Sequence, residues 1–126
     1  MKFLTRKLIT PADLNPRGTL HGGQLLKWID EEGGIHAALE LQTGLIVTKF
    51  ISEIEFKYPV LEGDVVEIGM QTNEVGTSSV NLSCDVRSMH ADRIVCTIDK
   101  IVYVRVNKYG LPKGHGWMSP KENKDG

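Results

Sequence analysis

The spacing of hydrophobic and polar residues changes character along the chain and predicts its elements in order. Residues 2–10 alternate weakly between polar and apolar side chains, which predicts a first strand. From Gln24 to about Gln42 apolar residues recur at helical spacing, and Thr43-Gly44 is a typical helix end. After residue 45 the chain becomes rich in β-branched residues, which favour strands.

The second half of the chain predicts four long strands separated by short turns. We expect them at Ile46–Lys57, Val65–Glu74, Ser79–Ser88 and Ile94–Val106. The third strand alternates most cleanly, and the phase of the fourth slips near Asp99-Lys100, which indicates a β-bulge. Such strands favour an antiparallel meander that curls strongly around one helix. The predicted fold class is therefore α+β, with a long central helix wrapped by a curled antiparallel sheet.

Length, composition and charge limit the possible functions. The 126 residues fit one domain, which we place at residues 1–118, followed by a polar tail at 119–126. A net charge of −1 without basic clusters argues against a nucleic-acid surface. No apolar run approaches the roughly 20 residues that span a bilayer, and the basic N-terminus lacks the unbroken apolar segment of a signal peptide. We therefore expect a cytoplasmic protein.

The cysteine and histidine residues predict no metal site. Cys84 and Cys96 are expected to be buried free thiols, and a disulfide between adjacent strands is the alternative. His36, His90 and His115 show no metal-ligand spacing with one another or with the cysteines.

A loop rich in glycine and proline leads directly into the predicted helix. The pair Gly22-Gly23 at the helix start leaves backbone N–H groups available to a carbonyl oxygen or an anion. Asp30, two turns further on, has apolar or small neighbours on its helical stripe, namely Leu26, Gly34 and Ala37. We expect a partly buried carboxylate that acts as a base, although a helix Asp is ordinarily a solvated surface residue. Together these residues suggest chemistry on an activated carbonyl.

Other residues near this motif have both a structural and a functional interpretation. Asn15 forms an Asx-turn or a helix-entry cap, or it orients a water or a substrate carbonyl. His21 packs in the loop or donates a hydrogen bond. The pair Gly33-Gly34 costs about 1 kcal/mol per glycine relative to alanine, which suggests that another backbone comes close, and a local kink is the alternative. The turn Gly76-Thr77-Ser78-Ser79 forms a hairpin, or it supplies N–H and hydroxyl donors to a phosphate or a pantetheine amide.

The run from Asn15 to Gly34 resembles the signature of the hotdog-fold acyl-CoA thioesterases, especially the broad-specificity bacterial enzymes and the brain-type cytosolic acyl-CoA hydrolases. The family pattern of an Asn, a Gly, a Gly-Gly pair and an acidic residue is matched by Asn15, Gly18, Gly22-Gly23 and Asp30. Weaker matches follow at Tyr58-Pro59-Val60, Gly63-Asp64-Val65-Val66 and Val75-Gly76-Thr77-Ser78-Ser79.

The resemblance implies a hotdog fold that hydrolyses acyl-CoA to a free acid and CoA without a cofactor. It implies at least a dimer, often as a trimer of dimers, with the site shared between subunits. Asp30 would be the catalytic carboxylate of one subunit and Asn15 would come from the other, while the N–H of Gly23 would bind the thioester oxygen. The residues expected to contact substrate are Gly22, His21, Gly76, Thr77, Ser78 and Ser79.

The resemblance leaves some alternatives open. Relatives often carry phenylalanine where this chain has His21, and Glu31 directly follows Asp30, although the helical stripe favours Asp30 as the inward carboxylate. The alternative function is a non-catalytic module that binds or senses acyl-CoA. A hydratase on the same fold is a third possibility, but its Asp/His loop is not found.

Overall fold

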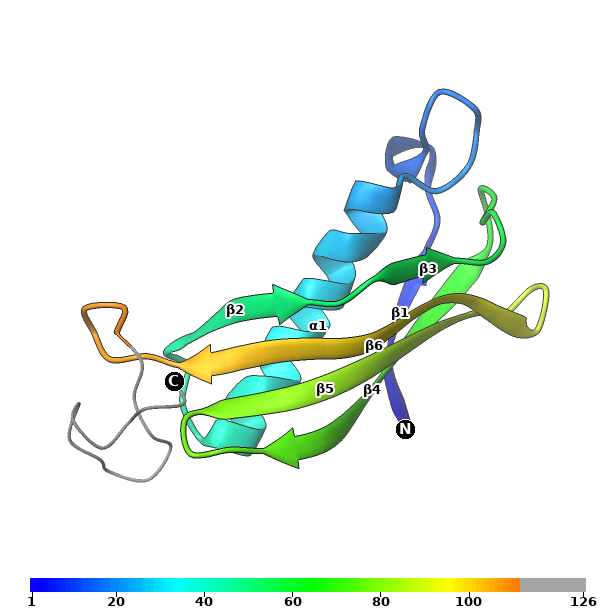
Figure 1. Ribbon diagram of the computed structural model, residues 1–126. Coiled ribbons are helices and arrows are strands. Elements are labelled where there is room, and N and C mark those ends of the chain that lie inside the picture. Colours follow the sequence, from blue (N-terminus) through cyan, green and yellow to red (C-terminus); the bar gives the residue numbers. More distant parts are fainter. Residues whose placement is uncertain (112–126) are drawn as a thin grey trace.

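The computed structural model describes residues 1–111 as one long helix packed against a curved antiparallel sheet (Figure 1). The elements are β1 (Lys2–Leu8), the 3-10 helix η1 (Pro11–Asp13), α1 (Gly22–Leu41), β2 (Ile46–Ile51), β3 (Ile54–Phe56), β4 (Val65–Val75), β5 (Ser79–Ser88) and β6 (Arg93–Arg105). The α+β class is confirmed, and the helix and last three strands lie close to their predicted bounds. The polar tail expected at 119–126 lies outside the described residues.

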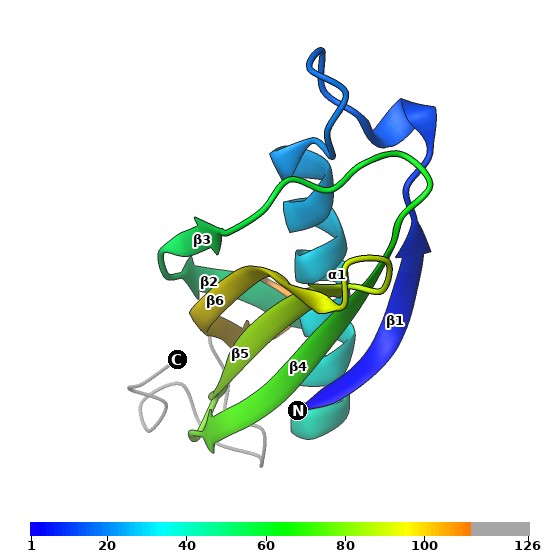
Figure 2. The ribbon, with the colours of Figure 1, turned by 90° about the vertical axis from the view of Figure 1, so that its right-hand side faces the viewer.

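The strand order is β1-β4-β5-β6-β2, with β3 also paired to β6, and every pair is antiparallel. Strands β4, β5 and β6 form the predicted meander. The segment after the helix does not continue that meander, because it pairs with the far side of β6 instead of with β4. The reason is that α1 carries the chain across the sheet from the β1 edge to the β2 edge. The connection from β3 to β4 then returns past the start of α1 (Figure 2).

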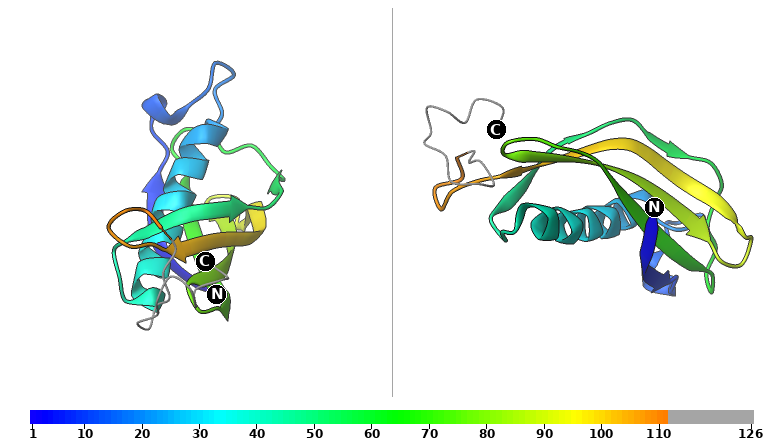
Figure 3. Two further views of the ribbon diagram at one scale, coloured as in Figure 1. Left: turned by 60° about the vertical axis from the view of Figure 1, so that its left-hand side comes forward. Right: turned by 90° about the horizontal axis from the view of Figure 1, so that it is seen from below.

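The strand predicted over Ile46–Lys57 is divided in two at a bend of the sheet. The break begins at Ser52, whose N–H donates to the carbonyl of Lys100 at 2.8 Å and whose hydroxyl accepts from the N–H of Lys100 at 3.0 Å. At the same level Asp99 and Lys100 together face Ser83 of β5, so the predicted bulge is confirmed. The sheet arches over the helix (Figure 3).

The core lies between α1 and the concave face of the sheet. The helix contributes residues at four-residue spacing, which are Leu25, Ile29, Gly33, Ala37 and Leu41, and the sheet contributes residues such as Ile68, Met70, Leu82, Ile98 and Tyr103. Cys84 and Cys96 lie in this core as free thiols, as predicted. Burial raises the pKa of both thiols, to about 11 for Cys96, so neither is a nucleophile near neutral pH.

Candidate functional site

The loop before α1 is a compact turn organised by Asn15. The Oδ1 atom of Asn15 accepts from the N–H groups of Arg17 at 2.9 Å and Thr19 at 3.2 Å, and Nδ2 donates to the Thr19 hydroxyl at 2.8 Å. Gly18 closes the turn at a φ of +83°, which favours glycine. The Asx-turn interpretation is thus what the structure shows. These bonds use one of the two amide N–H groups of Asn15.

Asp13 ties this loop to the helix. Its Oδ1 atom accepts from Nε2 of Gln24 at 2.9 Å, and its Oδ2 atom accepts from the N–H and hydroxyl of Thr10 at 2.9 and 2.8 Å. The hydrogen bond from the Thr10 backbone, followed by that from Gln24, lowers the pKa of Asp13. Sequence reasoning missed this residue, although Thr10 and Asp13 have the spacing of a capping box.

The two glycines at the helix start have different surroundings. The N–H of Gly23 donates to Nδ1 of His21 at 3.0 Å, so His21 caps the helix with its own ring. A Cβ atom at Gly23 would lie 2.9 Å from Cε1 of that ring. The N–H of Gly22 has no acceptor among residues 1–111. The free donor at the positive end of the helix is therefore on Gly22, whereas Gly23 was expected.

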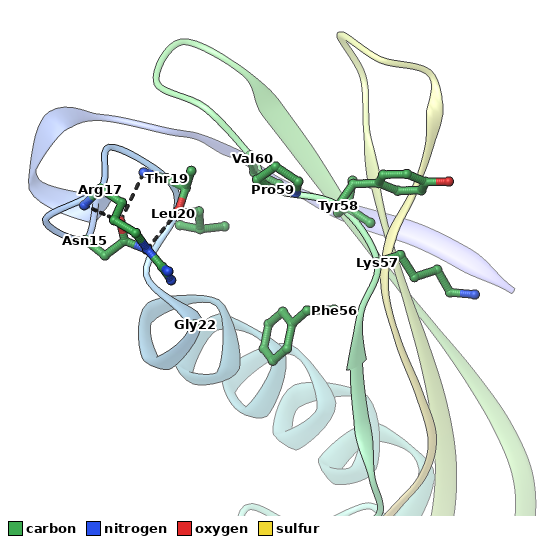
Figure 4. Close-up of a pocket in the computed structure, with 11 residues that line it drawn as sticks. Asn15, Arg17, Thr19, Leu20, Gly22, Phe56, Lys57, Tyr58, Pro59 and Val60 are labelled. Atoms are coloured by element: carbon green, nitrogen blue, oxygen red, sulfur yellow. Dashed lines mark hydrogen bonds between the residues drawn. The ribbon is translucent and has the colours of Figure 1, made fainter.

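A cavity of about 280 Å³ opens beside this helix start (Figure 4). It is lined by Asn15, Arg17, Thr19, Leu20, Gly22, Phe56, Lys57, Tyr58, Pro59, Val60 and Val95. The ring of Phe56 points toward the helix start, while the side chain of Lys57 points away from it. The cavity therefore unites Asn15 with Gly22, but Asp30 is not part of its lining.

Asp30 lies further along α1, facing strands β2 and β6. The hydroxyl of Thr48 donates to Oδ1 of Asp30 at 2.7 Å. The hydroxyl of Tyr103 lies 3.1 Å from both Oδ1 and the main-chain oxygen of Asp30 and donates toward them. Asp30 is half-buried at the border of the helix's buried stripe, whereas Glu31 is exposed. The prediction that Asp30 is the inward carboxylate is confirmed.

Sequence reasoning missed Tyr103 and Thr48, and it misjudged why the helix contains Gly33. A Cβ atom at Gly33 would overlap the Tyr103 hydroxyl and lie 2.9 Å from Cζ of its ring. Gly34 meets only the Ile46 side chain, 3.8 Å from the position of its Cβ. The expectation of a nearby backbone is wrong within this chain, because an aromatic side chain occupies that space. Burial first, and then the charge of Asp30, raise the pKa of Tyr103, so its hydroxyl stays protonated.

The turn Gly76–Ser79 lies at the opposite end of the sheet from the cavity (Figure 1). It joins β4 to β5, and the N–H of Gly76 donates to the carbonyl of Ser79 at 2.8 Å. Ser78 is fully buried, and its carbonyl accepts from the N–H of Arg105 at 2.7 Å. The hairpin interpretation is therefore what one chain shows. The residues expected to contact substrate form two separate groups in the single chain.

Residues 1–111 contain no group of three or more His, Cys, Asp or Glu side chains that could hold a metal ion. Within the same residues, α1 lacks the apolar character of a membrane-spanning helix, and no other helix qualifies.

Comparison with known proteins shows which family and which relatives this chain is similar to. The family model of the thioesterase superfamily matches residues 17–94. The chain is 37% identical over 117 residues to the acyl-CoA thioester hydrolase YciA of Escherichia coli, covering 88% of each protein. The crystal structure of the hexameric thioesterase y2039 from Yersinia pestis has a TM-score of 0.82 and 29% identity, covering 90% of this chain and 93% of that one.

A second solved structure is nearly as similar to this chain in its fold. It is HI0827, described as a hexameric broad-specificity acyl-coenzyme A thioesterase, with a TM-score of 0.81 and 25% identity. The match covers 96% of this chain and 88% of that one. The two fold matches confirm the hotdog arrangement, with one helix against a six-stranded sheet that does not close into a barrel.

Proposed function

The chain belongs to the thioesterase superfamily, and from this premise we propose that it hydrolyses the thioester of acyl-CoA to a free carboxylic acid and CoA. The observation that carries the proposal is the state of Asp30, a half-buried carboxylate held on one oxygen by two hydroxyls. The free N–H of Gly22 lies at the start of the same helix, about 12 Å from Asp30 at the rise of an α-helix, so it serves the Asp30 of a second copy of the chain. A base and an oxyanion donor are the two groups that thioester hydrolysis needs.

The reaction can follow either of two routes from these groups. Asp30 removes a proton from a water that attacks the carbonyl carbon, or it attacks that carbon itself and the mixed anhydride is then hydrolysed. In both routes the N–H of Gly22, at the positive helix end, stabilises the developing oxyanion, and CoA leaves as the thiol after protonation. Gly23 can add a second N–H when the His21 ring turns away. The proposed reaction needs no cofactor, because a thioester is already activated.

We propose that the working site forms between two copies of the chain. In one chain the cavity contains Asn15 and Gly22 but not Asp30. Strand β2 ends the strand order, so no further strand within residues 1–111 pairs with its outer edge. The β2 segment also exposes the apolar side chains of Leu45, Val47 and Phe50 next to Thr48, the residue that binds Asp30.

Pairing two β2 edges covers these apolar side chains and brings a second loop toward Asp30. A homodimer then holds two sites, each with Asn15 and the N–H of Gly22 from one subunit and Asp30 from the other. The hexameric Yersinia pestis relative supports a trimer of such dimers. We further propose a cytoplasmic location, with acyl-CoA and copies of the chain itself as the partners, as expected for a relative of a bacterial acyl-CoA hydrolase.

A thiol-release assay over acyl-CoA substrates of increasing chain length tests the function. We expect free CoA and free acid in equal amounts, and the rates will define the chain-length preference. Calorimetric binding of the same compounds is measured in parallel. Tight binding without hydrolysis at any chain length would favour the non-catalytic acyl-CoA module and overturn the proposal.

A further inference from the structure

The two carboxylate oxygens of Asp30 have different surroundings. Both hydroxyl donors, from Thr48 and Tyr103, are directed at Oδ1. No donor from residues 1–111 binds Oδ2. One oxygen is therefore held by the protein while the other is free to meet a water or a thioester carbon.

The sheet places the two donors side by side. Thr48 of β2 and Tyr103 of β6 are direct partners in the register of these strands, so their side chains emerge next to each other on the same face. Tyr103 is 1% exposed and lies in the core beneath the helix. A buried aromatic ring keeps its hydroxyl in one place, whereas the Thr48 side chain lies on an exposed edge strand.

The helix is shaped to admit the Tyr103 hydroxyl. Gly33 lies one turn after Asp30, and any side chain at this position would overlap the hydroxyl. The helix tolerates a glycine in its interior, although glycine weakens a helix relative to alanine. The same hydroxyl also reaches the main-chain oxygen of Asp30, so it holds the residue by its backbone as well as its side chain.

We propose that Tyr103 is a positioning residue for the reaction: seated in the recess at Gly33, it holds Oδ1 of Asp30 so that Oδ2 is the atom that takes the proton or attacks. This assignment rests on the proposed function. Tyr103 touches no substrate and acts only through Asp30. Its hydroxyl fixes the orientation of the carboxylate.

The variant Tyr103→Phe keeps the ring and removes only the hydroxyl. We expect kcat to fall about tenfold with little change in KM, because substrate contacts stay intact while the base loses its orientation. Tyr109→Phe is the matched control, because Tyr109 is 75% exposed in a turn remote from Asp30.

A double-variant cycle tests the recess at Gly33. Gly33→Ala should lower kcat in the wild-type background, because the new methyl group displaces the Tyr103 hydroxyl. In the Tyr103→Phe background the same change should cost less in kcat, because the hydroxyl is already absent. Equal costs in both backgrounds would contradict the proposed fit between the two residues.

The carboxyl carbon signal of Asp30 in NMR spectra at neutral pH gives a readout that needs no turnover. We expect this signal to shift in Tyr103→Phe, because the hydrogen bond to Oδ1 is lost, and to keep its position in Tyr109→Phe. An unchanged Asp30 signal, or an unchanged kcat in a protein that Asp30→Asn inactivates, overturns the role of Tyr103. A wild-type protein without hydrolysis overturns the proposed function instead, and the NMR signal still decides whether Tyr103 holds Asp30.

Discussion

Two carboxylates of this molecule, Asp30 and Glu67, are held in opposite ways. Glu67 lies on the outer face of β4 between its partners in the strand register, Arg6 and Arg87. Its Oε2 atom accepts from Nε of Arg6 at 2.7 Å and its Oε1 atom from Nε of Arg87 at 2.6 Å. Asp30 is bound on one oxygen only, and by neutral hydroxyls.

The difference shows that burial alone does not identify a reactive carboxylate. Glu67 is the more buried of the two, at 1% exposed, yet both of its oxygens are taken by cations. The hydrogen bond from Arg87, followed by that from Arg6, lowers the pKa of Glu67 and keeps it charged. Asp30 retains a free oxygen beside neutral donors. A structural carboxylate such as Glu67 differs from a candidate catalytic one such as Asp30 in two ways. These are the number of carboxylate oxygens that have no donor and the charge of the donors that are present.

Exchanging each carboxylate for its amide is expected to give the largest contrast. Asp30→Asn should lower kcat by about 10²–10⁴ without unfolding the protein, because it removes the base but keeps the shape. Glu67→Gln should leave kcat within about twofold. Thiol release and circular dichroism on both variants measure this. Near-normal turnover in Asp30→Asn would sink its assignment as the base.

Mixing two inactive variants tests whether Asp30 works with a partner's loop. Subunits with Asn15→Ala and subunits with Asp30→Ala are each expected to be nearly inactive. After subunit exchange at equal amounts, half of the dimers are mixed and each holds one intact site, so about one quarter of the wild-type activity should return. Native mass spectrometry confirms the exchange. No recovery despite proven exchange would argue against a shared site.

The local pattern of the sequence predicted what depends on near neighbours. Periodicity along the helix placed Asp30 inward, and alternation located β5 because each of its residues faces either the core or the outside. The pairing of β2 with β6 was not predictable, since strand order depends on contacts between distant segments. Tyr103 was missed for the same reason, because it lies 73 positions from Asp30 and reads as an ordinary strand residue.

The bond between His21 and Gly23 was also beyond the sequence. It depends on which way the imidazole ring turns at the helix start, and the residue pattern carries no information about that rotamer. The sequence marked the glycine pair correctly as the helix entrance, but it could not tell which of the two amides would be free.

Replacing Glu67 should lower the thermal stability of the protein, whereas replacing Asp30 should not. The pKa of Glu67 is lowered in the folded state. Its contribution to the stability of the fold is therefore present above the pKa of the unfolded chain, near 4.5, and is lost as the pH falls through the pKa of the folded protein. Glu67→Gln should lower the Tm at pH 7 by several degrees, because two guanidinium groups lose their charged partner. The difference from wild type should shrink on acidification. Thermal unfolding from pH 7 to pH 3 measures both effects, and a constant difference would contradict this role.

Asp13 is an intermediate case, and its replacement is expected to have the smallest effect. Both of its oxygens are taken, as in Glu67, but the donors are neutral, as in Asp30. Asp13→Asn should cost about 1 kcal/mol of unfolding free energy, since the amide cannot accept on both atoms. We expect kcat to change by less than about threefold. Denaturant unfolding with the same thiol assay measures both, and a loss of kcat as large as that of Asp30→Asn would place Asp13 in the catalytic machinery.

The contact between Tyr103 and Gly33 bears on when Asp30 becomes oriented as the chain folds. A helix with two glycines at its centre is weak in isolation, so α1 gains much of its stability from the sheet. Asp30 receives its Tyr103 partner only after β6, the last strand within residues 1–111, has joined that sheet. Asp30 is thus oriented only while β6 is in place, and loosening β6 would release β2 and β3 as well, because both pair with it.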